Sequence, residues 1–214
     1  MPTNAPMSGR SRLGRLTPRP RGRVSAAADG RFGAGSSTPI RVDVQDQRAD
    51  PVALPVAPQR LAELLVDTLI DAGVPGPAQA DLTMVDPDTI ASLNVEHLGG
   101  DGPTDVLSFP LDPFPDDAWP VAPPDPAGAV PPRMVGDVVI CPAVAVAQAS
   151  GHAGSPADEL ALLVVHAGLH LVGHDHAEPD EAAVMVAAER AVLAERWGPL
   201  TGDPWADTSA SDTA

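Results

Sequence analysis

Residues 166–176 read HAGLHLVGHDH and contain four of the six histidines of this 214-residue chain. Residues four apart lie on one face of an α-helix, so His166 and His170 can bind one ion from adjacent turns. Gly173 can adopt the left-handed conformation that ends a helix, and a chain that turns back there brings His176 towards the same ion. Three protein nitrogens leave a fourth position for water, which is the arrangement of catalytic zinc sites. The segment predicts one zinc ion held by His166, His170 and His176.

The residues before this segment predict a buried helix. Ser155 is suited to the N-cap and Pro156 to the first helical position, and Asp158 follows three residues after the cap. From Leu160 onward the helix is apolar on all sides, which is typical of a buried element. A buried imidazole without a partner costs about 1–3 kcal/mol. The histidines are either separately hydrogen-bonded core residues or ligands of a shared ion, and their spacing favours the ion.

Length and composition indicate one domain with extended ends. A single cysteine, Cys141, excludes an intrachain disulfide framework and fits a reducing cytoplasm. No apolar run approaches the roughly 20 residues that a membrane span needs. We therefore expect a cytoplasmic protein without a membrane partner.

The net charge of −16 is unevenly distributed. Residues 1–38 hold seven arginines and one acid, whereas the remainder holds six arginines and 28 acids. We expect residues 1–38 to be a disordered tail rich in Arg, Pro and Gly, and residues 199–214 to be a flexible C-terminal tail. The acidic domain between them, residues 39–198, argues against nucleic-acid binding, because phosphates prefer Lys and Arg.

The pattern of apolar residues predicts an α+β fold. Alternation at Ile40, Val42 and Val44 indicates a strand, and the leucines from Leu61 to Leu69 indicate a helix. Further strands are expected at 81–85, 104–109 and 134–141, and further helices at 87–99, 142–150 and 179–197. Residues 110–133 contain nine prolines and predict a long loop. This order favours a mixed, partly parallel four-stranded sheet covered by helices.

A zinc site of this kind favours hydrolysis, because zinc lowers the pKa of bound water to about 7. The pattern HxxxHxxGxxH is also the spacing of the metzincin proteases. Those enzymes need a glutamate directly after the first histidine as general base, and this chain has Ala167 there. The alternative of a zinc metalloprotease therefore lacks the general base that such an enzyme needs.

Three blocks resemble the YbeY family of bacterial metal-dependent endoribonucleases and rRNA maturation factors. HAGLHLVGHDH is similar to the family's HGxLHLxGYDH, residues 103–110 to its PTDVLSFP segment, and residues 136–140 to its GDIVI strand. The blocks stand in the family's order, and the resemblance covers Ile40 to Trp197.

The resemblance implies single-stranded RNA cleavage in 16S rRNA 3′-end maturation and ribosome quality control. It implies His166, His170 and His176 as zinc ligands, in a cleft beside the buried central helix. The implied partners are the 16S rRNA precursor and a ribosomal subunit or ribosomal proteins. Two ligand-flanking positions, Ala167 and His174, depart from the family pattern, and His174 is a possible competitor for the metal. Leu98 stands where many members have an arginine, so another group must contact phosphate.

No general base can be assigned from the sequence. Asp175 is a candidate to orient a ligand or to accept a proton, or it caps the turn after Gly173. Ser108 either contacts substrate or is a small polar residue at a strand end. The open alternative is a non-catalytic ribosome-assembly factor with a structural zinc.

Four other polar residues are expected to lie outside the chemistry. Asp105 and Asp137 stand in the matching blocks, where strand acids often accept backbone N–H groups, so we expect structural roles. His97 and His152 lie in helix-end or loop contexts and are expected at the surface.

Overall fold

The structure is a computed structural model that describes residues 24–27, 39–111, 123–124, 126, 128 and 130–206. The strands are β1 (Val24–Ala27), β2 (Ile40–Asp46), β3 (Ala78–Met84), β4 (Val106–Pro110) and β5 (Arg133–Ile140). The helices are α1 (Pro58–Asp71), α2 (Pro87–Leu98), α3 (Pro142–Gln148), the 3-10 turn η1 (Ala149–Gly151), α4 (Pro156–Leu171) and α5 (Pro179–Arg196). Every helix and strand that the sequence predicts is present, with small shifts at the ends.

The sheet is mixed and partly parallel, as the sequence predicts. Its order is β1-β2-β3-β5-β4, with β2, β3 and β5 parallel and the two edge strands antiparallel. The edge strand β1 is a fifth strand that the sequence analysis missed, because its residues VSAA show no alternation of large apolar side chains. It falls within the tail expected to be disordered, and the rest of residues 1–38 lies outside the described residues.

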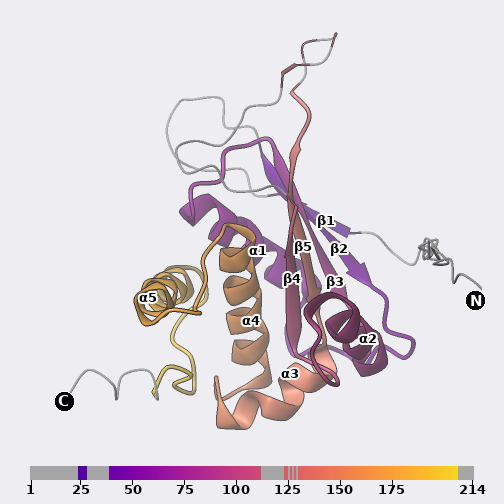
Figure 1. The fold of residues 1–214 in the computed structure, drawn as a ribbon, viewed down its shortest axis with the longest axis vertical. Coiled ribbons are helices and arrows are strands. Elements are labelled where there is room, and N and C mark those ends of the chain that lie inside the picture. Colours follow the sequence, from indigo (N-terminus) through magenta and orange to yellow (C-terminus); the bar gives the residue numbers. More distant parts are fainter. Residues whose placement is uncertain are drawn as a thin grey trace, which may run out of the picture.

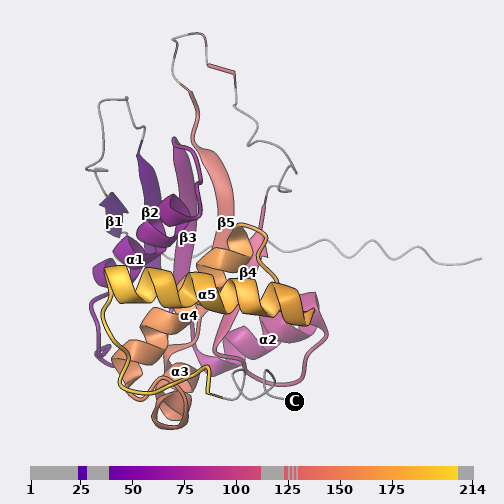
Figure 2. The ribbon, with the colours of Figure 1, turned by 90° about the vertical axis from the view of Figure 1, so that its left-hand side faces the viewer.

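The helices form layers on the sheet (Figure 1). α1 and α4 cover one face, and α2 packs against the end of the other. α5 lies outside α4 and crosses it, which Figure 2 shows from the side. No helix in the described part of the chain is long and apolar enough to cross a membrane.

α4 is the buried central helix that its sequence predicts. Ser155 accepts the N–H of Asp158 at 3.2 Å and caps its start, and Pro156 occupies the first helical position. Leu160, Val164 and Leu171 pack towards the sheet. Ala161, Leu162, Val165 and Leu169 pack instead in the cluster that includes α5. Apolar side chains are therefore required on both faces of α4. Because both faces are packed, the helix fixes the positions of its histidines.

The C-terminal segment after α5 folds back over the domain as far as residue 206, where we had expected a flexible tail from 199. The N–H and hydroxyl of Thr201 donate to Asp158 at 3.1 and 2.7 Å, and Trp205 donates its indole N–H to Glu189 at 2.8 Å. Polar anchoring of this kind leaves no periodic signal in a sequence. Most of the proline-rich loop predicted at 110–133 lies outside the described residues.

Replacing Gly136 by alanine is expected to lower the free energy of unfolding by about 1–3 kcal/mol, because overpacking forces backbone to move. A Cβ at this position in β5 meets the carbonyl oxygen of Phe109 at 2.5 Å and Cδ2 of Leu171 at 2.7 Å. Urea unfolding measures the change. Gly151→Ala is the control, since its Cβ meets nothing within 4 Å. Equal stability of the two variants contradicts the prediction.

Candidate metal centre

Three histidines converge at the C-terminal end of α4. One ring nitrogen from each of His166, His170 and His176 lies within 4.8 Å of the others, a spacing at which they can hold a metal ion. The Nε2 atoms of His166 and His170 are 3.1 Å apart, as expected for imidazoles one helical turn apart. His176 arrives from the loop after α4, and its ring centroid lies 5.4 and 5.0 Å from those of the other two.

The turn after α4 both returns the chain and orients the ring of His170. Gly173 has a φ of +87°, in the left-handed region that its position predicts. The N–H of His174 donates to the carbonyl of Leu169 at 3.1 Å and closes the turn. The carbonyl of His174 then accepts Nδ1–H of His170 at 2.8 Å. His174 thus contributes a backbone oxygen, and its ring is outside the three-histidine cluster.

Glu189 orients the first histidine, and the sequence analysis missed it. This α5 residue is 4 % exposed, and its Oε1 accepts Nδ1 of His166 at 2.7 Å. Its other oxygen accepts the indole N–H of Trp205. A signal existed, because Glu189 shares the buried face of α5 with Met185, Val192 and Leu193. A lone acid in such an apolar stripe indicates a buried partner.

The donor set fits a divalent transition metal. Burial and the neighbouring His166 ring lower the pKa of His170, which favours the neutral imidazole that metal binding requires. Because Nδ1 of both His166 and His170 faces an oxygen acceptor, the protonated nitrogen is Nδ1 and the Nε2 lone pairs point to a common position. Carboxylate and carbonyl acceptors behind ligating histidines are the usual arrangement in metal sites.

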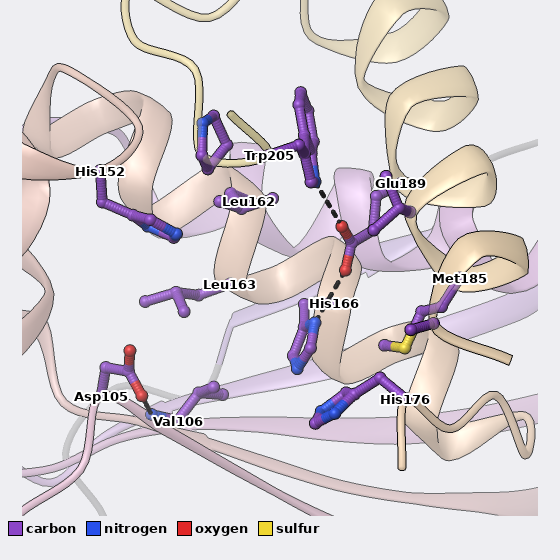
Figure 3. A pocket seen from close by; sticks show the side chains of 13 residues that line it. Asp105, Val106, His152, Leu162, Leu163, His166, His176, Met185, Glu189 and Trp205 are labelled. Carbon is purple, nitrogen blue, oxygen red and sulfur yellow. Dashed lines mark hydrogen bonds and ion pairs between the residues drawn. The ribbon is translucent and has the colours of Figure 1, made fainter. Parts of the chain in front are cut away.

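A cavity of about 420 Å³ opens beside the histidines (Figure 3). His166 and His176 form part of its wall, together with the α4 side chains Leu162 and Leu163. The remaining lining comes from the start of β4 and the residue before it, α5, the loop before α4 and the C-terminal segment: Asp105, Val106, His152, Ala182, Met185, Val186, Glu189, Pro204 and Trp205. No arginine from the described residues lines this cavity.

The other candidates do not belong to the cluster of three histidines. Asp175 is exposed, and its carboxylate accepts the N–H of His176 at 2.7 Å, which also lowers the pKa of Asp175. Ser108 is half-buried on β4, and the described cavity wall includes Asp105 and Val106 of that strand end but not Ser108. Leu98 ends α2 and is 66 % exposed.

Asp105 has the contacts expected of a structural strand acid. Its carboxylate accepts the N–H of Val106 at 2.8 Å and the hydroxyl of Thr104 at 3.0 Å, and Gln148 donates to it. Asp137 lies opposite Asp81 on the neighbouring strand, and burial together with the Asp81 carboxylate raises its pKa.

The two remaining histidines differ in their environment. His97 is exposed, as expected, with its ring 5.2 Å from that of Phe109. His152 is exposed as well, with 42 % of its side chain accessible, but it also lines the cavity and contacts the buried Glu159, which the sequence did not predict. The acid that decides its position stands seven residues further along the chain, in the first turn of α4.

A family model described as Endoribonuclease YbeY matches residues 46–196. The chain belongs to the YbeY family. A YbeY endoribonuclease of Salinispora tropica is 46 % identical over 126 residues, which span 59 % of this chain and 79 % of that protein. One of Corynebacterium glutamicum is 44 % identical over 138 residues, 62 % of this chain and 68 % of that protein. A solution structure from Thermotoga maritima, 24 % identical, aligns with a TM-score of 0.44 over 79 % of this chain and 96 % of the other.

Proposed function

We propose that this chain is a zinc-dependent endoribonuclease that cleaves single-stranded RNA. The observation that carries the proposal is the convergence of three imidazoles at a cavity wall, two of them with Nδ1 bonded to an oxygen. Three nitrogen ligands leave a coordination position for substrate or water. The relatives named above are endoribonucleases, and their RNA substrate class comes to this chain with the proposal.

The side chains around the cavity have three different roles in the proposed reaction. His166, His170 and His176 hold the zinc, which when bound polarises the scissile phosphate and neutralises developing charge. Glu189 and the carbonyl of His174 fix the rings of His166 and His170. The apolar wall of Leu162, Leu163 and Met185 keeps the local dielectric low, which strengthens electrostatic stabilisation in the cavity.

The setting we propose is late 16S rRNA 3′-end maturation and ribosome quality control in the cytoplasm. A ribosomal subunit or ribosomal protein then presents the RNA end. Such a partner also supplies positive charge to a domain whose acids far outnumber its arginines.

The deciding experiment is metal analysis of the purified protein together with an RNA cleavage assay. We expect one zinc ion per chain, cleavage of an unstructured oligoribonucleotide, and no cleavage of the same strand in a duplex. A chelator stops the reaction, and added zinc restores it. Cleavage that persists after zinc is fully removed overturns the proposal.

The arginines of the N-terminal tail are expected to add nonspecific attraction for RNA. The change replaces all seven with glutamine: Arg10, Arg12, Arg15, Arg19, Arg21, Arg23 and Arg31. The slope of log binding constant against log salt then flattens by up to about 5, because each phosphate contact on a single strand adds about 0.7. A tail of identical composition in scrambled order is the control. If the salt-dependence slope is unchanged, the tail does not contribute to RNA binding, and a partner must supply the positive surface.

A further inference from the structure

A second histidine–carboxylate pair faces the cavity opposite the metal ligands. Nδ1 of His152 lies 3.0 Å from both Oε1 and Oε2 of Glu159. Figure 3 shows the His152 ring entering the cavity from the side opposite His166 and His176. The first turn of α4 supplies the acid, and the loop after η1 supplies the ring.

Glu159 is built into the fold as an acceptor. Its side chain is fully buried, and it also accepts the N–H of Ala153 at 3.1 Å and the amide of Gln148 at 3.0 Å. A buried carboxylate with donors on each side is held in place. Because it faces Nδ1 of His152, that nitrogen carries the proton, and Nε2 keeps its lone pair.

The other titratable groups of the cavity wall are already engaged. Glu189 accepts from His166 and Trp205. Asp105 accepts from Thr104, Val106 and Gln148. Among the described residues that line the cavity, His152 is therefore the one whose basic atom is neither a candidate metal ligand nor bonded to protein.

We propose that Nε2 of His152 accepts the proton of the water that attacks the scissile phosphate, an inference that rests on the proposed endoribonuclease function. The water oxygen forms the new bond to phosphorus with its electron pair as its proton moves to Nε2. The bond from phosphorus to the leaving ribose oxygen breaks, and that oxygen keeps the bonding pair and takes a proton from solvent. His152 then returns its proton to solvent. Glu159 is a positioning residue, because it acts only through the His152 ring.

The test compares His152→Gln with His97→Gln, an exposed histidine outside the cavity, in zinc-loaded full-length protein. We expect kcat for oligoribonucleotide cleavage to fall about 10²- to 10⁴-fold in H152Q, the usual contribution of a general base. KM, zinc content and the circular dichroism spectrum stay at wild-type values, and H97Q keeps full activity. Added imidazole restores part of the activity of a His152→Ala variant, which a purely structural role does not allow.

A second variant, Glu159→Gln, separates positioning from folding. The amide keeps the size of the side chain but presents one acceptor oxygen where the carboxylate presents two, so kcat falls with KM unchanged. Full activity of H152Q beside an active wild type overturns the inference alone. Loss of zinc or of folding in H152Q, without imidazole rescue of H152A, also overturns it. A wild type that cleaves no RNA overturns the proposed function and the inference together.

Discussion

Replacing His170 by alanine is expected to leave the protein folded, with a weakened zinc site and without RNA cleavage. Four-ligand zinc sites bind with about 10–16 kcal/mol, so one ligand contributes on the order of 3 kcal/mol, or about 10²-fold in affinity. His170 is half-buried in the last turn of α4, and its ring faces His166 and His176. Competition with a chromogenic chelator measures the affinity, and the oligoribonucleotide assay measures cleavage.

His174→Ala is the matched control for His170→Ala. Its ring lies outside the cluster, and alanine preserves the backbone carbonyl that orients His170. We expect wild-type zinc affinity in this control. A H170A variant that unfolds favours the alternative of a ribosome-assembly factor with a structural zinc.

The histidine variants also bear on peptide hydrolysis. A protease would need a general base directly after His166, but that position holds Ala167, which has no acid–base group and is fully buried in the core cluster between α4 and the sheet. Peptide cleavage by the wild type that is lost in H170A would revive the protease alternative.

Replacing Glu189 by glutamine is expected to weaken zinc binding about 10- to 100-fold, the usual effect of losing a group that orients a ligating histidine. The carboxylate accepts from His166 and from Trp205 at once. A glutamine has one carbonyl oxygen, so its NH₂ group must face one of these two donors. At limiting zinc, the rate of RNA cleavage by the variant falls in proportion to the loss of zinc affinity. Saturating zinc restores most of that rate.

Glu195→Gln removes an acid from the same helix without touching the site, since that side chain is 68 % exposed. It is expected to bind zinc as the wild type does. If E189Q and E195Q bind zinc equally, Glu189 has no influence on the metal.

The sequence predicted those parts of the molecule whose signals are local. Ser155 and Pro156 define the start of α4, its apolar residues define its burial, and Gly173 defines its end. The spacing of His166, His170 and His176 was therefore enough to predict that the three rings lie close together. The mixed sheet followed from the alternation of strands and helices.

What the sequence did not predict depends on contacts between distant segments. Glu189 and Trp205 reach the site only because α5 crosses α4, and no periodicity in either segment specifies that crossing. The position of His152 at the cavity wall was not predicted, because its partner, Glu159, belongs to the next helix. The strand β1 is too short and its residues too small to be recognised without its neighbour β2.

The hydrogen bond from Trp205 to Glu189 has an optical consequence. The chain has three tryptophans and no tyrosine, so its ultraviolet emission comes from few indoles. Trp205 shares a carboxylate with His166, and the Arg190 guanidinium lies 4.8 Å from the centre of its ring. A cation that draws charge from His166 changes the field at this indole, so intrinsic fluorescence reports loading of the site in real time. Trp205→Phe identifies the responsible fluorophore by removing the signal change.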